Sequence, residues 1–398
     1  MKVGVSAGKL PSRIGMPLSG YRPIRRSSAE HRPLYVRVTL FESGAGELFI
    51  AILIDALAVG KKWSEQMKGR IRRLFPDRRV YVAIASTHSH SSHVNALCGD
   101  EVVVLVFPDV FAAAGPDEEW SRAVLESVLK AFRSLDNLTA VRLYSRAVSG
   151  VGASRRERGT YMWLPLQVAQ FICADHPPIV WANFPCHPTV LGRGHTWISP
   201  DLHGSAAQML QERGYRVGGV WNGPAADIST RFTRRESSVG ELERLSCRLA
   251  GHIGDLLNRR SWEREIRPSN LAACEWSYLL HPKLRPGKPP PDSAQSEDIM
   301  EGIRALSRVT LSSELLSVSI WKFDSWTIRW VPGELPLSAF LRDRMASTRF
   351  PADRWIIGYA NDYPGYLMPE EDGSYESVMT LYNPKEIRRL IDELREPI

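Results

Sequence analysis

The hydrophobic pattern of the chain alternates between a period typical of β-strands and one typical of α-helices. Residues 34–41 and 48–54 are rich in β-branched and aromatic side chains, and the turn-forming sequence ESGAGE between them predicts a β-hairpin. Residues 62–75 carry apolar side chains at helical spacing, namely Trp63, Met67, Ile71 and Leu74. Residues 79–86 are almost continuously apolar, which indicates a strand covered on both faces.

The same alternation continues through the rest of the chain. A helix is predicted for residues 117–135, where GPDEEW supplies an N-cap and acids in the first turn. Residues 179–184 and 217–221 predict two more strands, and residues 315–330 are rich in β-forming side chains. Three further helices are predicted, at residues 201–213, 237–257 and 384–394. This alternation predicts an α/β fold with central β-sheets flanked by helices.

Length and composition favour one large domain. The chain has 398 residues, of which 43% are hydrophobic, enough for an extensive core. The proline-rich sequence HPKLRPGKPPPDSAQ at residues 281–295 interrupts the pattern, but strand-like segments lie on both sides of it. We therefore interpret residues 1–398 as a single domain with a long surface loop at residues 281–295.

Charge, cysteine content and hydropathy argue against several classes of protein. The net charge is +7, but Lys and Arg are scattered and do not form the cluster typical of nucleic-acid binding. The five cysteines are odd in number and contain no CxxC pair, which argues against a disulfide framework or a thiolate zinc site. The N-terminus lacks a signal-peptide core, and no run approaches the ~18 apolar residues of a membrane helix. We expect a cytoplasmic protein without nucleic-acid partners or stable membrane insertion, of unspecified oligomeric state.

The segment THSHSSH, from Thr87 to His93, directly follows the apolar strand at residues 79–86. Residues two apart in an extended chain share a face, so His88 and His90 are expected to point the same way. Neutral imidazole is the commonest metal ligand in proteins. Three histidines behind a buried strand therefore predict a metal-binding or catalytic site in preference to an ordinary surface turn.

Three other segments are candidates for a functional site. His187 follows the strand at residues 179–184, and open α/β sheets place their sites at the carboxyl ends of strands. The loop at residues 221–232 offers backbone N–H groups and the Ser229 hydroxyl. Glu334 follows a strand through a Pro-Gly turn, and three tyrosines crowd the loop after it, namely Tyr363, Tyr366 and Tyr375. Alone, each segment fits an ordinary turn as well as a site.

Taken together and in order, these segments resemble the motifs of the neutral, non-lysosomal ceramidase family, in its catalytic domain. The resemblance covers essentially the whole chain. The matching sequences, in order, are LSGY, THSHS, CHPTVLG, SPD, ADIST, VPGEL and NDYPGY. The resemblance implies the neutral-ceramidase-like catalytic fold.

The resemblance also implies one zinc ion (Zn2+) per chain. Its ligands would be two histidines, a glutamate and a tyrosine, namely His88, His187, Glu334 and Tyr366. His90 would lie beside the zinc-bound water and move its proton. Asp201 would orient a ligand histidine.

Four more positions correspond to residues around the family's substrate. Arg155 and Tyr375 would stabilise the oxyanion, and Gly20 and Ser229 would line the substrate site. Zinc lowers the pKa of its bound water to about 7, so that this water can attack an amide carbonyl. The implied activity is that of a zinc-dependent hydrolase acting on a small-molecule N-acyl compound, either ceramide-like or more polar.

Two other functions fit parts of the sequence. His88, His90 and His93 resemble the HxHxDH motif of metallo-β-lactamase-like binuclear hydrolases, although Ser92 stands where that motif has aspartate. This likeness covers one segment, whereas the ceramidase likeness covers several. The second alternative is a non-catalytic binding module on the same scaffold. The sequence SHVNALCGD, which contains Cys98, differs from the family and is expected to shape the mouth of the pocket.

Overall fold

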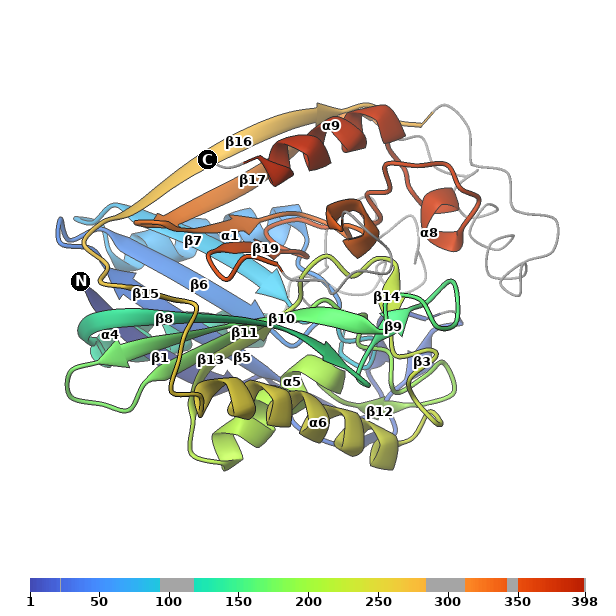
Figure 1. Ribbon diagram of the computed structural model, residues 1–398, viewed down its shortest axis with the longest axis horizontal. Helices are drawn as coiled ribbons and strands as arrows, with labels where there is room; N and C mark the ends of the chain where they lie inside the picture. Colours follow the sequence, from blue (N-terminus) through green and yellow to red (C-terminus); the bar gives the residue numbers. More distant parts are fainter. Residues whose placement is uncertain (22, 94–117, 284–311, 342–349, 397–398) are drawn as a thin grey trace.

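The computed structural model describes residues 1–21, 23–93, 118–283, 312–341 and 350–396. In this part of the chain four layers are stacked: a layer of helices, a nine-stranded sheet, a four-stranded sheet and a last helix (Figure 1). The hydrophobic core is divided accordingly, with clusters between each pair of neighbouring layers. The predicted α/β fold with central sheets flanked by helices is confirmed.

The larger sheet is mixed, with parallel pairs toward its two ends. Eight of its strands follow one another in the order β13 (Arg216–Trp221), β11 (Ile179–Asn183), β10 (Trp163–Cys173), β8 (Asp136–Ser149), β1 (Lys2–Lys9), β5 (Tyr35–Glu42), β6 (Leu48–Ile54) and β7 (Val80–Ser86), and β15 (Arg264–Ile266) pairs with β8. β6 pairs with β7, and β11 with β13, in parallel. The strands that precede His88 and His187, β7 and β11, thus lie toward opposite ends of the sheet.

The two halves of this sheet come back together at the site. β1 and β8 are joined by two pairs of residues only, so the halves separate beyond that point. β13 and β11 then lie against β5, where the Trp181 Nε1–H donates to Thr39 Oγ1 over 2.9 Å. A Cβ at Gly218 would lie 2.4 Å from the same oxygen, so this close approach requires glycine. The carboxyl ends of β7 and β11 consequently meet.

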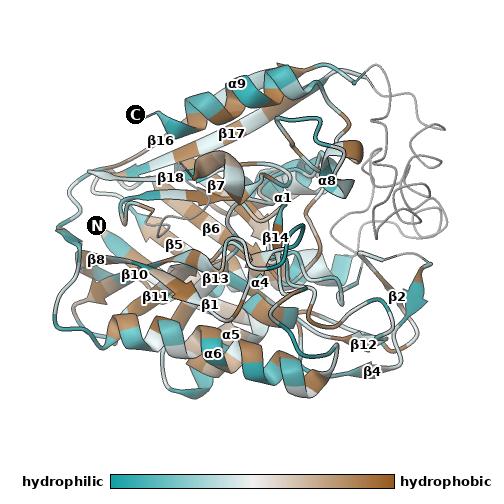
Figure 2. Ribbon diagram, turned by 45° about the vertical axis from the view of Figure 1, so that its right-hand side comes forward, coloured by the Kyte–Doolittle hydropathy of each residue, from teal (hydrophilic) through white to brown (hydrophobic). Residues whose placement is uncertain are grey.

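Four helices cover the outer face of the larger sheet: α1 (Lys61–Leu74), α4 (Glu118–Arg133), α5 (Asp201–Glu212) and α6 (Val239–Leu257). Side chains of β6 alternate as expected for a strand covered on both faces. Ile50 and Ile52 pack toward helices α1 and α4, whereas Phe49 and Ala51 face the second sheet. The surface helices carry both hydrophobic and hydrophilic stripes (Figure 2), as a helix does when one face is buried.

The second sheet contains β16 (Leu271–Leu280), β17 (Glu314–Phe323), β18 (Trp326–Trp330) and β19 (Arg354–Ile357). Its inner face contributes to a cluster of buried tryptophans between the two sheets, which we call the tryptophan layer: Trp181, Trp221, Trp321, Trp326, Trp330 and Trp355. Its outer face is covered by α9 (Pro384–Arg395), which buries Ile387, Leu390, Ile391 and Leu394. The second sheet is thereby covered on both faces.

Most predicted elements are confirmed, and several strands were not predicted. The hairpin is β5 and β6, and the predicted helices correspond to α1, α4, α5, α6 and α9. Residues 315–330 form two strands, β17 and β18, because the chain reverses at Asp324, whose φ is +49°. The long strands β1, β8 and β10 were missed, whereas β16 corresponds to the strand-like segment before residue 281. Residues 117 and 284–295 of the predicted helix and loop lie outside the described residues.

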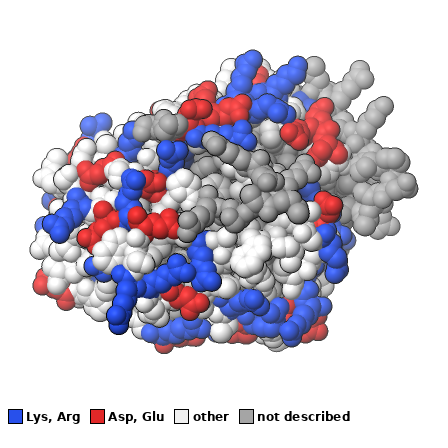
Figure 3. All heavy atoms as spheres, in the orientation of Figure 1, with Lys and Arg blue, Asp and Glu red and all other residues white. Residues whose placement is uncertain are grey.

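Short elements connect the sheets to the site. They are β2 (Pro17–Leu18), β3 (Arg25–Arg26), β4 (Ala29–Glu30), β9 (Ala153–Ser154), β12 (Trp197–Ile198), β14 (Ile228–Ser229), η2 (Leu337–Phe340) and α8 (Tyr375–Val378). Among the described helices, none combines the length and apolar content needed to cross a membrane. Basic and acidic side chains are intermixed on the face drawn in Figure 3.

Candidate metal centre

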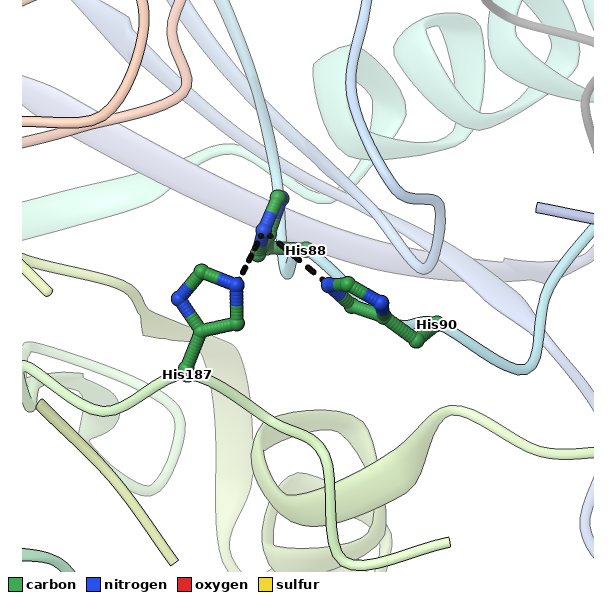
Figure 4. Close-up of side chains that lie close together, drawn as sticks. All are labelled: His88, His90 and His187. Carbon is green, nitrogen blue, oxygen red and sulfur yellow. Dashed lines mark hydrogen bonds between the residues drawn. The ribbon is translucent and has the colours of Figure 1, made fainter. Parts of the chain in front are cut away.

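Three histidine rings meet where β7 and β11 end. The Nε2 atom of His88 lies 3.0 Å from Nε2 of His187 and 3.3 Å from Nε2 of His90, and all three rings are buried (Figure 4). Within the described residues this is the group of His, Cys, Asp and Glu side chains whose ligand atoms lie within 4.8 Å of one another. The sequence prediction that His88, His90 and His187 belong to one site agrees with this geometry.

Backbone carbonyls fix the proton positions on these rings. The Nδ1 atom of His88 lies 2.7 Å from the Leu57 carbonyl oxygen, that of His90 lies 3.0 Å from the Gly20 oxygen, and that of His187 lies 3.4 Å from the Ala225 oxygen. A carbonyl oxygen only accepts, so each Nδ1 carries the hydrogen and each neutral ring presents an Nε2 lone pair. Three lone pairs then converge without a hydrogen between them, an arrangement that a cation stabilises.

Burial keeps these imidazoles neutral. It holds the pKa of His88 and His187 well below the ordinary value of histidine. Burial also lowers the pKa of His90 to about 3, helped by the positive charges of Arg155 and Arg25. Neutral imidazole is the form that binds metals, so the site is in its ligand state at neutral pH.

Glu334 adds a carboxylate to the centre. It follows β18 through a turn in which Gly333 has φ +70°, and a Cβ there would lie 2.7 Å from the Gly365 oxygen. Its Oε1 and Oε2 atoms lie 3.6 Å from His88 Nε2 and from His187 Nδ1 respectively. Oε2 is buried and makes no hydrogen bond within the described residues. Burial raises the pKa of Glu334 to about 8, so ionisation there requires a compensating positive charge.

Three tyrosines lie near this carboxylate, of which Tyr359 is buried and Tyr363 and Tyr366 are partly buried. The Tyr363 hydroxyl donates to Glu334 Oε1 over 2.5 Å. Tyr366 pairs with Glu334 through the backbone, and its hydroxyl accepts from Arg155 Nη1 over 3.4 Å. Tyr359 stacks on the His88 ring with the centroids 4.2 Å apart. Sequence reasoning selected Tyr366 but gave no role to Tyr359 or Tyr363, although the aromatic-rich sequence GYANDYPGY was a signal.

Arg155 and Tyr375 lie on the other side of Tyr366. Nε of Arg155 forms an ion pair with Glu376 over 3.1 Å. Burial alone would lower the pKa of Arg155, but the neighbouring Tyr366 hydroxyl and Glu376 carboxylate raise it above its ordinary value. The Tyr375 ring lies 5.9 Å from the Tyr366 ring, edge to face. The predicted pair Arg155 and Tyr375 is therefore adjacent to Tyr366, and Glu376 is a neighbour that the sequence did not reveal.

Gly20 and Ser229 both contact the centre through their backbone. A Cβ at Gly20, whose φ is +90°, would lie 2.4 Å from Nδ1 of His90, so only glycine fits beside this ring. Ser229 pairs with His187 through the backbone, and its hydroxyl accepts from the Arg231 N–H over 3.1 Å. Their proposed contacts with substrate remain predictions.

The prediction that Asp201 orients a ligand histidine is wrong. Asp201 is the first residue of α5, and its carboxylate accepts instead from the backbone N–H groups of Val190, Leu191 and Leu202. Burial raises its pKa to about 7. Backbone carbonyls orient the histidines, as described above, and that role cannot be read from side-chain identities.

His93 is not a member of the histidine group among the residues that the structure describes, and its backbone bridges to Leu18. The predicted binuclear motif needs His88, His90 and His93 together, so the geometry favours His187 as the third histidine. Cys98, the other position left open by the sequence, lies outside the described residues.

The residues present suit a zinc ion. Zinc prefers imidazole nitrogen together with carboxylate oxygen; here the nitrogens converge from His88, His90 and His187, and Glu334 Oε1 lies 3.6 Å from His88 Nε2. The Glu334 Oε2 atom, buried without a hydrogen bond among the described residues, is the kind of atom that a cation would satisfy. The Tyr363 hydroxyl contacts Glu334 directly, and Tyr366 pairs with Glu334 through the backbone.

Comparison with solved structures identifies the fold. A ceramidase in complex with C2 has a TM-score of 0.73 and 15% sequence identity, over 99% of this chain and 74% of its own. Neutral ceramidase from Pseudomonas aeruginosa has a TM-score of 0.72 and 14% identity, over 99% of this chain and 73% of its own. No protein-family model and no curated protein matches the sequence. The chain has the neutral ceramidase fold, as its motifs predict.

Proposed function

We propose that this protein is a zinc-dependent hydrolase that cleaves the amide bond of a small-molecule N-acyl compound. The observation that carries this proposal is the convergence of three buried Nε2 lone pairs on one point beside the Glu334 carboxylate. The fold adds support, because both solved structures reported above are described as ceramidases. Ceramide is itself an N-acyl compound, so the proposed type of bond is the one found in the substrate of a ceramidase. The amine and the acyl group are to be identified by experiment.

In this proposal one zinc ion is held by His88, His187, Glu334 and Tyr366. When bound, zinc acts as a Lewis acid and lowers the pKa of water to about 7. The carbonyls of Leu57 and Ala225 keep the first two rings in the ligand tautomer. The chain thus supplies a rigid donor set on strand ends and turns.

Other residues of the chain act on the substrate. Nε2 of His90, directed toward the centre, is proposed to accept a proton there and to pass it to the leaving amine. Arg155 and Tyr375 are proposed to donate to the oxyanion that develops on the amide oxygen. Arg155 is held for this purpose by its ion pair with Glu376.

The substrate in this proposal is either ceramide-like or a more polar N-acyl compound. The interest in a polar compound rests on the sequence SHVNALCGD, which differs from the family at the expected mouth of the pocket. A panel of a short-chain ceramide and N-acyl amino acids would distinguish the two.

The first experiment is to measure metal content on protein purified without added metal and to assay that panel. About one zinc per chain and hydrolysis of a panel member would support the proposal. About two metals per chain would favour the binuclear alternative and make His93 a ligand. No bound metal, even after zinc is added, would overturn the proposal and favour a binding module.

A further inference from the structure

Asn222 has a side chain that touches both of the turns that carry the facing histidines. It follows β13 directly and is fully buried. Its Nδ2 donates to the Cys186 carbonyl over 3.3 Å and to the Thr87 carbonyl over 3.4 Å. Its Oδ1 accepts from the Cys186 N–H over 3.2 Å. All these partners are backbone groups, so the contacts depend on where the two turns lie.

The partners of Asn222 immediately precede the metal-facing residues. Thr87 is followed by His88 and Cys186 by His187, whose Nε2 atoms lie 3.0 Å apart. β7 and β11, which end in these turns, are not neighbours in the sheet, so no ladder of strand hydrogen bonds fixes the separation of their ends. The Asn222 amide spans this separation directly.

The chemistry of this position matches an amide. Two carbonyl oxygens need a donor with two hydrogens and one N–H needs an acceptor, which together are the functions of a carboxamide. A carboxylate of the same shape could accept from Cys186 but could not donate to either carbonyl. The Asn222 backbone oxygen also accepts from the Gly358 N–H over 2.9 Å, next to the Tyr359 ring that stacks on His88. Position 222 therefore joins three segments of the centre.

We infer that Asn222 is a positioning residue that sets the separation of His88 and His187 and thereby the affinity of the centre for its metal. This inference rests on the proposed function, since it treats those histidines as ligands. Outer partners of metal ligands typically change metal affinity by about 10–100-fold when they are replaced. An effect in that range is expected for Asn222, although it contacts the ligands only through the backbone before them.

Asn183 supplies a matched control. It is also a buried asparagine at the end of a strand, and its Nδ2 donates to Gln167 Oε1 over 3.0 Å and to the Ile356 carbonyl over 3.2 Å. Its amide therefore ties β11 to β10 and β19, and not to the histidine turns. Asn222→Ala and Asn183→Ala remove the same group from comparable surroundings.

The test compares wild type, Asn222→Ala, Asn222→Asp and Asn183→Ala. Zn2+ affinity is measured by chelator competition, the ligand field by the absorption spectrum of the Co2+-substituted protein, and folding by the melting temperature of the metal-free protein. We expect both alanine variants to lower the melting temperature. Only the two Asn222 variants should weaken Zn2+ binding by about 10–100-fold and change the Co2+ spectrum. Equal affinities in Asn222→Ala and wild type, or an equal loss in Asn183→Ala, would overturn the inference.

A metal-free measurement separates this inference from the proposed function. If wild type binds neither ion, the proposed function fails, but the positioning role is still tested by crystal structures of metal-free wild type and Asn222→Ala. The inference expects the His88–His187 Nε2 distance to increase from 3.0 Å in the variant. An unchanged distance would overturn it.

Discussion

The histidine centre and the tryptophan layer are both buried, and they are built from the same strands, yet their physical chemistry is opposite. β11 contributes Trp181 to the layer and leads, a few residues later, to His187 in the centre. In the layer, indole rings pack edge to face, with Trp181 and Trp221 centroids 5.0 Å apart. In the centre, the backbones of His88 and Tyr359 have positive φ values of 67° and 55°, which residues other than glycine rarely adopt.

The electrostatics of the two regions differ as well. The layer is almost wholly apolar, whereas burial in the centre raises the pKa of Glu334 to about 8 and lowers the pKa of His90 to about 3. Both shifts favour the uncharged form of the group, so the metal-free centre carries little charge near neutral pH. We conclude that the tryptophan layer stabilises the fold and fixes the positions of the strand ends. The turns beyond these strands hold buried polar side chains, such as Glu334 and His90, whose favourable interactions require a ligand.

Replacing Glu334 by glutamine should affect the histidine centre strongly and the tryptophan layer hardly at all. Glutamine has nearly the same shape and its oxygen can still accept from Tyr363, but it is a poor zinc ligand. We expect zinc affinity to fall by more than the roughly 100-fold that is the upper range for outer partners, with loss of hydrolysis. The melting temperature of the metal-free protein should change little, because burial already disfavours the charged carboxylate.

Glu241→Gln is the control for this change. Glu241, on α6 away from the centre, is also buried, and it accepts from Arg244 and from the Arg235 N–H that precedes the helix. The Glu241→Gln variant should retain its zinc and have a lower melting temperature than wild type. Full retention of zinc by Glu334→Gln, measured by metal analysis after dialysis, would remove Glu334 from the ligand set.

Arg155→Ala tests whether the centre acts on a transition state as well as on a metal. Removing a single oxyanion donor typically lowers kcat by about 10²–10³-fold. We expect a fall of that size in kcat with a smaller rise in KM, measured by steady-state kinetics on the best N-acyl substrate. Arg156→Ala, which breaks ion pairs with Glu376 and Asp372, should lower kcat by less than about tenfold. A change in KM alone would place Arg155 in ground-state binding.

The sequence predicted the amphipathic elements and missed strands whose pattern is less regular. α1 and α6 were recognised because one apolar stripe at helical spacing faces the sheet. β16 was noted as strand-like but without bounds, because most of its residues are partly or fully exposed and it lacks a continuous buried side. β1 contains Gly4 and Gly8, where a Cβ would clash with α4, so its strand propensity is low for a reason that only the packing reveals.

The candidate site was predictable where a residue type at a strand end was informative by itself. The histidine-rich segment that begins at His88 was selected in this way, whereas His187 and Glu334 were selected through the resemblance to the ceramidase family. The structure brings His88, His187 and Glu334 together. Asn222 was not selected, because its contacts exist only once the two ends of the larger sheet have met. Tyr363 was noted in its loop but was given no role, because its hydrogen bond to Glu334 joins the turns after β18 and β19 of the second sheet. Asp201, which was selected from the SPD motif, was assigned the wrong partners, because its carboxylate accepts from backbone N–H groups whose positions the motif does not reveal.

Trp181→Phe gives the smallest expected effect and tests the other half of the comparison. The change removes an indole ring from a fully buried position and leaves the Thr39 hydroxyl without the Nε1–H donor. We expect a loss of about 1–3 kcal/mol in the free energy of unfolding, measured by urea titration of the metal-free protein. Zinc stoichiometry and affinity should stay within about twofold of wild type, because β11 keeps its backbone ladder and Asn222 still spans the histidine turns. If this substitution released the metal, the two regions would be energetically coupled, and the separation of stability from chemistry inferred above would not hold.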